Sequence, residues 1–296
     1  MTRVLVFGAA GFIGRGVRQA LDADPRVSTV LCPGRADCDL LRSGVDDLAA
    51  LFDRARPDAV VNCTGRLAGS GYELVQANTV VTAKLVEAVA TAAPAARLVR
   101  LGSAGEYGPV AHGRVVSEED PAVPVSEYGV SHHAATRLVE LATAAGRIDG
   151  VVLRVFNPVG AGLHEENLLG RATSLLRQAR STGADHITLG SLGAYRDFVD
   201  VRDVATAVVA AVFTDDLPPR VFNVAGGRAV PARHAVRLLA DAAGFTGEIR
   251  EQGPAPDRSA TVGWMRADIG RAARVLGWAP AHDLTSSVTA IWTGSP

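Results

Sequence analysis

The chain has 296 residues, of which 48% are hydrophobic, and a formal net charge of −1. This length allows one large α/β domain, or a larger and a smaller lobe, and the composition predicts a sizeable core and argues against wholesale disorder. The nearly neutral charge gives no electrostatic reason to expect nucleic acid or an anionic membrane surface as a partner.

The three cysteines, Cys32, Cys38 and Cys63, form a sparse, odd-numbered set without the spacing of metal ligands, which indicates a reducing compartment. The first apolar run, residues 4–7, is too short for a signal-peptide core or a membrane span. We therefore expect a soluble cytoplasmic protein, and no metal site.

The first 157 residues alternate short apolar runs with segments of helical spacing. Strands are expected at 3–7, 27–31, 58–62, 98–101 and 150–156, and helices at 12–21, 45–52, 75–92 and 127–145. Alternation of this kind, with nearly continuous apolar strands, predicts an α/β fold whose parallel sheet is covered on both faces. The arrangement is a doubly wound, Rossmann-type fold.

After Pro158 the rhythm changes. Helices are expected at 165–180 and 203–213 and strands at 186–189, 197–199 and 220–224, followed by a mixed remainder with a Pro-rich stretch at 253–256 and two weak helices. We predict a dinucleotide-binding Rossmann domain formed by residues 1–157 and 190–225. Residues 158–189 and 226–296 would form a second, smaller, interleaved substrate-binding lobe.

Gly8, Gly11 and Gly14 follow the first strand and open the first helix, in the spacing G-x-x-G-x-x-G. Glycines there allow a tight turn and let the backbone approach a pyrophosphate, while the helix N-terminus offers N–H groups to the anion. In this strand–turn–helix context the motif predicts a dinucleotide cofactor.

The end of the second strand bears on the choice of cofactor. An acidic residue there would bind the ribose 2′-hydroxyl of NAD, but this strand ends at Cys32 without one. Arg15 and Arg35 lie close by and favour a 2′-phosphate, so NADP (NADPH) is expected in preference to NAD. The alternative is that both are ordinary solvated arginines. Asp39 and Leu40 are expected to border the adenine.

Several motifs occur in a fixed order along nearly the whole chain. They are Gly8–Gly14, Ser103–Gly108, Tyr128–His132, and residues 154–160, 195–204, 221–224 and 276–280. Together they resemble the extended short-chain dehydrogenase/reductases, the family of NAD(P)-dependent nucleotide-sugar epimerases, dehydratases and 4-keto reductases. The motifs at 102–108 and 196–204 look most like the 4-keto-6-deoxy-sugar reductase branch.

The resemblance implies roles for individual residues. Tyr128 would act as general acid or base on the substrate oxygen, and Ser103 would hydrogen-bond the same oxygen. Asn157 and Arg196 would contact the substrate, and Arg196 would bind its diphosphate. The alternative for Arg196 is an ion pair with Asp197 or Asp200. Asn78 would brace the site. The full expected cofactor set is Gly8, Gly11, Phe12, Ile13, Gly14, Arg15, Arg35, Asp39, Leu40, Cys63, Tyr128, His132 and Phe156.

His132 departs from the family pattern, because a Lys normally follows the Tyr by four residues. An unperturbed imidazole is mostly neutral at pH 7, so His132 supplies little standing charge. It could be a working substitute, the substrate could assist protonation, or catalysis could be lost. We favour a hydrogen bond from His132 to the cofactor ribose. On that hypothesis His132→Lys keeps activity, and Tyr128→Phe costs less than the roughly 10²–10⁴-fold of an essential general acid.

The sequence thus predicts an NADP(H)-dependent oxidoreductase with an atypical active site, a ketoreductase of secondary metabolism or antibiotic biosynthesis. Its substrate would be a 4-keto deoxysugar nucleotide or an aromatic polyketide-type ketone. One alternative is a nucleotide-sugar 4-epimerase, and another is a non-catalytic dinucleotide-binding regulator. The expected partner is this small-molecule ketone, without nucleic acid or membrane, and a homodimer is left open.

Overall fold

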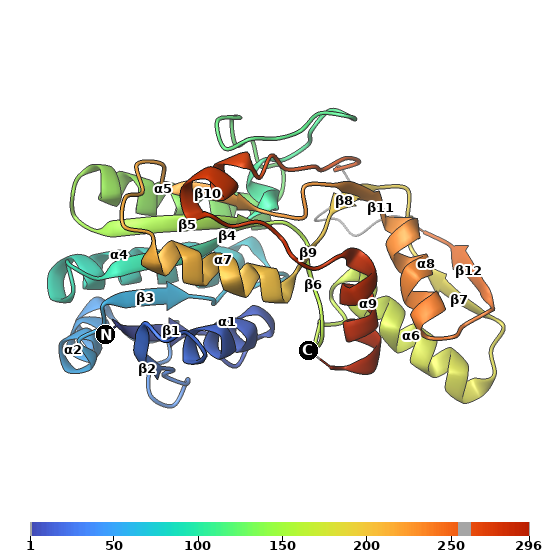
Figure 1. Ribbon diagram of the computed structural model, residues 1–296, viewed down its shortest axis with the longest axis horizontal. Helices are drawn as coiled ribbons and strands as arrows, with labels where there is room; N and C mark the ends of the chain where they lie inside the picture. The colour runs from blue at the N-terminus through green and yellow to red at the C-terminus, as the bar shows by residue number, and fades with distance from the viewer. Residues whose placement is uncertain (1, 254–261, 296) are drawn as a thin grey trace.

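The computed structural model describes residues 2–253 and 262–295, with a six-stranded sheet at its centre (Figure 1). The strand order is β10-β5-β4-β3-β1-β2, and every neighbouring pair is parallel. The bounds are β1 Thr2–Phe7, β2 Val27–Leu31, β3 Ala59–Asn62, β4 Arg97–Ser103, β5 Asp149–Val155 and β10 Val221–Val224. The predicted Rossmann-type fold is confirmed.

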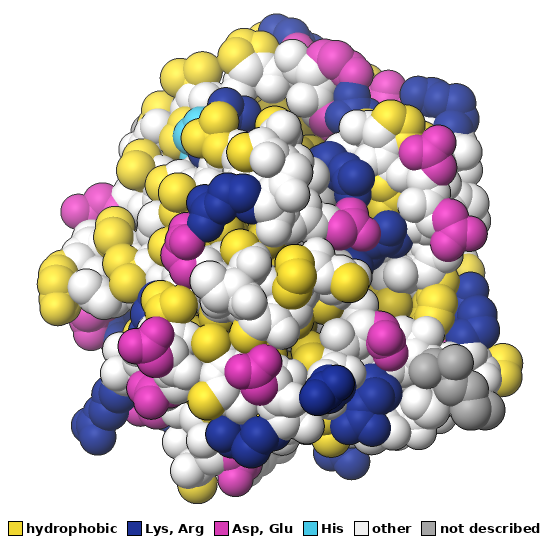
Figure 2. All heavy atoms as spheres, turned by 90° about the vertical axis from the view of Figure 1, so that its left-hand side faces the viewer, with side chains coloured by type: hydrophobic (Ala, Val, Ile, Leu, Met, Phe, Trp, Pro, Cys, Tyr) yellow, Lys and Arg dark blue, Asp and Glu magenta, His cyan; other side chains and the backbone are white. Residues whose placement is uncertain are grey.

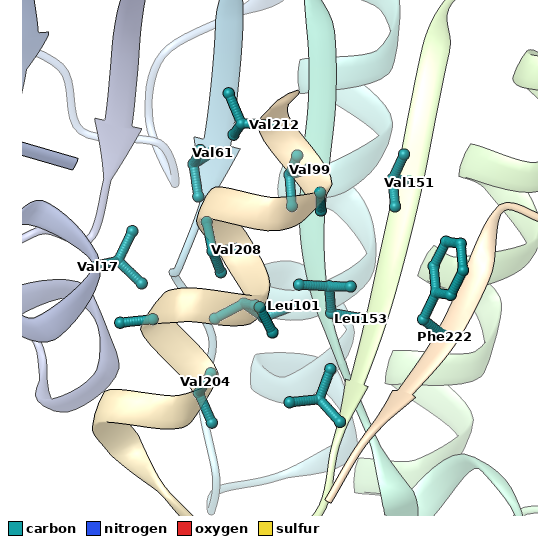
Figure 3. Packing of buried hydrophobic residues seen from close by; sticks show 14 of the residues in the cluster. Val17, Val61, Val99, Leu101, Val151, Leu153, Val204, Val208, Val212 and Phe222 are labelled. Carbon is teal, nitrogen blue, oxygen red and sulfur yellow. The ribbon is translucent and has the colours of Figure 1, made fainter. Parts of the chain in front are cut away.

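Helices cover both faces of this sheet. Helices α1 (Phe12–Asp22) and α7 (Val201–Phe213) pack on one face, and α2 (Val45–Ala55), α4 (Val81–Ala92) and α5 (Glu127–Ala144) pack on the other. Figure 3 shows Val204, Val208 and Val212 of α7 lying over the strand residues Val99 and Leu153. Because both faces are covered, the strands are apolar nearly throughout.

The helix expected at 75–92 is interrupted. A short α3 (Gly71–Leu74) leads into a π-helical segment, η1 (Val75–Val80), before α4 begins at Val81. The wider turn carries Asn78, whose side chain is buried and donates to Ser131 Oγ of α5 at 3.0 Å. A π-helical turn inside a longer helix often marks a functional position.

The second group of elements lies beside the sheet, on the right of Figure 1. It contains α6 (Leu168–Thr182), α8 (Ala232–Ala242), α9 (Leu284–Thr293) and the parallel pair β7 (His186–Leu189) with β12 (Glu248–Glu251). These elements share one apolar core. The strand expected at 197–199 is in fact two, β8 (Tyr195–Asp197) and β9 (Val199–Asp200), which pair with different partners. Of the Pro-rich stretch at 253–256, only Gly253 lies within the described residues.

The expected division into a Rossmann domain and a lobe stays a prediction. Two sets of contacts lead us to propose other limits for the two parts. Strand β8 pairs with β11 (Ala229–Pro231), and β9 pairs with β6 (Pro158–Val159), so residues 195–200 join the lobe strands. Conversely, the π-helical segment η4 (Ala272–Leu276) packs into the core beneath α7. The two parts are therefore interleaved more finely than the sequence pattern indicated.

At one end of the molecule Lys and Arg side chains are interspersed with Asp and Glu side chains, as the balanced overall charge leads one to expect (Figure 2). No helix among residues 2–253 and 262–295 is long and apolar enough to cross a membrane. The three cysteines are free and half-buried. In that same part of the chain, no cluster of His, Cys, Asp and Glu has the arrangement of a metal site.

Candidate active site

A cleft of about 1540 Å³ opens at the carboxyl ends of β1, β2 and β3. It lies where the chain order reverses, between β1 and β3, and such switch points bind ligands in doubly wound folds. Seven expected cofactor residues line it: Gly8, Gly11, Arg15, Arg35, Asp39, Leu40 and Cys63.

The glycine-rich turn brings β1, β3 and α1 into close contact at the floor of this cleft. Gly8 has a φ of +77°, and a Cβ there would lie 3.0 Å from the Cys63 backbone. A Cβ at Gly14 would lie 2.0 Å from the Gly8 carbonyl oxygen. The N-cap of α1 is Gly11, and its first turn holds no acidic residue, so its N–H groups can receive an anion. The turn fits the pyrophosphate of a dinucleotide.

Three expected cofactor residues are packed into the protein and do not line the cleft. Ile13 packs against the core of the sheet, and Gly14 is buried against the turn. Phe156 has no exposed surface, and its ring packs 6.0 Å from that of Tyr107. The expected contact of Phe156 with the cofactor stays a prediction, because its side chain packs with Ala104 and Val116 in a separate apolar cluster and is not among the residues that line the cleft.

Arg18 is a cleft residue that was not predicted from the sequence. It lies on α1 one turn beyond Gly14 and lines the cleft with Cys32 and Gly34 at the end of β2. Its Nε is 3.4 Å from Asp22 Oδ2. The signal was available, because residues three and four apart share one helix face, so Arg18 continues the face that Arg15 begins.

Ser103 and Tyr128 come from different elements and meet at one point. Ser103 ends β4, and Tyr128 stands in the first turn of α5. A Cβ at Gly105 would lie 3.3 Å from two Tyr128 ring carbons and 3.4 Å from Ser103 Oγ. Gly105 thus leaves the space that both side chains border, and the predicted pair of residues is brought together.

His132 lies one turn further along α5 and is buried beside Tyr128, with 4.6 Å between the ring centroids. Its Nδ1 is 3.1 Å from Nη2 of Arg100. Burial, together with the nearby Arg100 charge, lowers the pKa of His132 well below its ordinary value. His132 is therefore a neutral imidazole at physiological pH.

A buried ionic cluster lies directly behind these residues. Glu106 Oε2 accepts from Arg154 Nε at 2.9 Å, and Glu106 Oε1 is 4.0 Å from Arg100 Nη1. All three side chains are nearly or completely buried. Gly102 leaves room for the cluster, because a Cβ there would lie 2.5 Å from Glu106 Oε1.

This cluster was not predicted from the sequence, although the sequence contains a signal for it. Arg100 and Arg154 each lie in the buried part of a strand, β4 and β5, and buried charges are rare unless they are paired. In the parallel register Arg154 lies opposite Gly102. Two charged residues in neighbouring buried strands therefore indicated a shared partner.

The remaining predicted residues lie around this centre. Asn78 donates to Ser131 Oγ and to the Arg66 carbonyl, and its Oδ1 accepts from Arg66 N, so it ties α5 to the loop after β3. Asn157 has a φ of 34°, uncommon for a residue with a side chain, and its Nδ2 donates to the Asp197 carbonyl at 2.8 Å.

Arg196 is half-buried on β8, and its Nη1 donates to the Tyr195 carbonyl at 2.9 Å. Burial lowers its pKa. Of the two acids considered as its partners, Asp200 forms a bidentate pair with Arg202 instead, at 2.8 and 2.9 Å.

Comparison with known proteins extends these observations. A family model described as the NAD dependent epimerase/dehydratase family matches residues 4–225. The chain is 43% identical to a dTDP-6-deoxy-L-talose 4-dehydrogenase (NAD(P)(+)) from Kitasatospora kifunensis, over 98% of this chain and 95% of that protein. It is 29% identical to a GDP-6-deoxy-D-mannose reductase from Pseudomonas aeruginosa, with the same coverage.

Solved structures agree with this similarity. RMD from Pseudomonas aeruginosa, solved in complex with NADPH, superposes with a TM-score of 0.87 at 27% identity, covering 99% of this chain and 97% of that one. The similarity spans both the sheet and the adjoining lobe.

Proposed function

Because this chain belongs to the NAD dependent epimerase/dehydratase family, we propose that it is an NADP(H)-dependent 4-keto reductase of a dTDP-linked 6-deoxyhexose. It is an oxidoreductase, and the same residues would serve the reverse reaction, oxidation of the 4-hydroxyl. The observation that carries the proposal is the meeting of Ser103 and Tyr128 around Gly105, at the sheet edge beside the dinucleotide-type cleft.

The glycine turn and the first turn of α1 would hold the pyrophosphate, and Arg18 and Arg35 line the cleft near the end of β2, where a 2′-phosphate would lie. When bound, the nicotinamide supplies the hydride that no side chain of the protein can provide. His132, as a neutral imidazole, can form a hydrogen bond with a ribose hydroxyl.

The residues around Gly105 would manage the proton. Ser103 Oγ accepts from Gly105 N at 3.1 Å, which leaves its hydroxyl proton free to donate to a ketone oxygen. The Tyr128 hydroxyl would deliver a proton to that oxygen as negative charge develops on it. Asn78 and Ser131 fix the first turn of α5, and so the position of Tyr128, since Ser131 Oγ donates to the Tyr128 carbonyl at 2.8 Å.

The substrate class rests on the similarity to the dTDP-6-deoxy-L-talose 4-dehydrogenase, which extends over nearly the whole of both chains. Such a substrate carries a diphosphate, and a guanidinium binds phosphate oxygens well. Arg196 is our candidate for that contact. The full-length similarity to sugar-nucleotide enzymes gives the polyketide-type ketone no comparable support.

Steady-state kinetics with purified protein tests the proposal. We expect NADPH oxidation with a dTDP-4-keto-6-deoxyhexose, and slower or no oxidation with GDP- and UDP-linked analogues. NADP⁺ reduction with dTDP-6-deoxy-L-talose tests the reverse direction. Protein that binds NADPH but turns over none of these sugars, or that epimerises UDP-glucose without net change in the cofactor, would contradict the proposal.

A further inference from the structure

Arg100 gives this site a feature that the proposed function does not include. Arg100 is only 2% exposed. Each nitrogen of its guanidinium group nevertheless has a polar partner in the protein. Its Nε donates to Thr82 Oγ1 at 3.2 Å, its Nη1 donates to Thr136 Oγ1 at 3.1 Å, and its Nη2 faces His132. The contacts come from both α4 and α5, so the guanidinium is fixed in one orientation.

The contact with His132 fixes the state of the imidazole. A guanidinium has donors and no acceptor, so Nδ1 of His132 must accept through its lone pair at this 3.1 Å distance. The ring proton then resides on Nε2. An imidazolium would present an N–H at Nδ1 toward the Arg100 N–H, placing two donors and two positive charges against each other.

The charges of the buried cluster do not cancel. Arg100 and Arg154 contribute two positive charges, and Glu106 contributes one negative charge. Glu106 is closer to Arg154, at 2.9 Å, than to Arg100, at 4.0 Å. Tyr107 covers Arg154 with its ring, 4.6 Å from the guanidinium carbon, and its hydroxyl donates to Asn223. One positive charge therefore remains, on the side that faces α5.

We propose that Arg100 is a positioning residue that supplies the permanent positive charge of the active site and holds His132 as a neutral Nε2–H imidazole beside Tyr128. The family arrangement combines charge and ribose contact in one Lys. Here the two tasks are divided between Arg100 and His132. The inference rests on the proposed function only in giving Tyr128 its catalytic role.

The proposal gives Arg100 a direct effect on the phenol. His132 links the two groups, since its Nδ1 is 3.1 Å from Arg100 Nη2 and its ring centroid is 4.6 Å from that of Tyr128. Burial lowers the pKa of Arg100, while the charges of Glu106 and of a Tyr128 phenolate act in the opposite direction. Such an interaction is mutual, so the guanidinium favours the Tyr128 phenolate. His132, being neutral, contributes no charge of its own.

The first test uses wild-type protein without substrate. Nitrogen NMR of histidine-labelled protein distinguishes the two neutral tautomers and the imidazolium, and His132→Gln assigns the signal among the seven histidines. We expect His132 to remain the Nε2–H tautomer from roughly pH 5 to pH 8. An Nδ1–H tautomer, or an imidazolium that forms near pH 6–7, would overturn the proposal.

The second test measures the phenol. The chain has four tyrosines, so the ultraviolet titration of wild type minus that of Tyr128→Phe isolates Tyr128. The same subtraction is made in Arg100→Met and Arg100→Lys backgrounds. Arg100→Met should raise the Tyr128 titration midpoint by about one to three pH units, and Arg100→Lys should restore most of the difference.

Arg97→Met is the matched control, because Arg97 is a largely buried, ion-paired arginine on the same strand that pairs with Asp149. It should leave the Tyr128 midpoint unchanged. An unchanged midpoint in folded Arg100→Met, or an equal change in Arg97→Met, would overturn the proposal. Both tests omit the sugar, so a negative kinetic result with dTDP-sugars would refute the proposed function and leave this inference standing.

A third test moves the positive charge from position 100 to position 132. His132→Lys alone places an ammonium against Arg100, so we expect it to lower activity, which reverses the expectation from sequence. The double variant Arg100→Met with His132→Lys should recover at least tenfold over His132→Lys in kcat. A fully active His132→Lys single variant would contradict the division of roles.

Discussion

Gly14 on α1 packs directly against the carbonyl group of Gly8, since a Cβ at position 14 would lie only 2.0 Å from that oxygen. This contact sets the separation between the first strand and the first helix, and with it the turn that forms the floor of the cleft. Gly14→Ala should destabilise the protein by about 1–3 kcal/mol and raise the Kd for NADPH at least about tenfold. Thermal unfolding and fluorescence titration measure the two effects.

Gly16→Ala is the matched control for that variant. It lies on the same helix, but its Cβ would lie 3.6 Å from the Val201 carbonyl oxygen, an ordinary contact. Because glycine is unfavourable in a helix interior, this variant should gain up to about 1 kcal/mol and bind NADPH normally. Equal losses of stability and of NADPH affinity in both variants would show that the effect comes from the helix and not from the turn.

Cofactor preference should depend on Arg35, which lines the cleft beyond the end of β2. Replacing Arg35 with Asp removes a partner for the 2′-phosphate and adds a repelling charge. The ratio of kcat/KM for NADPH to that for NADH should fall roughly 10- to 100-fold. Arg54→Asp, on the exposed side of α2, should leave the ratio as it was. A wild-type enzyme that prefers NADH would refute the assignment.

Tyr128→Phe should lower kcat by roughly 10²–10⁴-fold while NADPH binding is retained. The sequence alone predicted a milder loss, because His132 offered no charge to assist the phenol. Arg100 supplies that charge under our inference, so Tyr128 becomes an ordinary general acid. Single-turnover measurements with the dTDP-ketosugar separate this loss from product release. A loss of less than tenfold would favour protonation by the substrate or water.

Arg196→Ala should raise the KM for the dTDP-sugar about 10- to 100-fold, the loss of a charge-assisted contact worth roughly 1.5–3 kcal/mol. NADPH affinity should be unaffected. Arg233→Ala serves as the control, because its exposed guanidinium pairs with Glu251. Calorimetry with dTDP alone gives a direct measure, and equal dTDP affinity in wild type and Arg196→Ala would remove Arg196 from the diphosphate site.

Asp197 makes stability depend on pH. Burial raises the pKa of this carboxyl group to about 7, although Ala267 N donates to Oδ2 at 2.9 Å. The folded state therefore favours the protonated form. Its contribution to stability is fully present below the unfolded pKa, about 4, and is lost as pH rises through about 7.

Urea unfolding at acid and neutral pH measures this dependence. The free energy of unfolding of wild type should fall by up to roughly 4 kcal/mol more than that of Asp197→Asn across this interval. Asp216→Asn, at an exposed position, should behave as wild type does. Parallel curves for wild type and Asp197→Asn would show that Asp197 keeps an ordinary pKa.

Local pattern in the sequence predicted most of the sheet. Strand β2 at 27–31 and strand β7 at 186–189 have the expected bounds, because their apolar runs are short and well delimited. The prediction of one continuous helix at 75–92 was wrong, because the backbone forms a π-helical segment around Asn78. The π-helical segment around Asn78 satisfies a long-range hydrogen bond to Ser131, and local periodicity does not contain that requirement.

The sequence by itself determined the Rossmann-type fold and the glycine turn, because both depend on local spacing along strands, turns and helices. The roles of Ser103 and Tyr128, which lie on different elements, were expected from the family resemblance. Only the tertiary structure decided the environment of His132. Its neutral state depends on Arg100, 32 residues away on another element, and on burial that only the packed helices and sheet provide. Electrostatic interactions act through space and gain strength as water is excluded, so their partners are set by the fold and not by the neighbouring sequence.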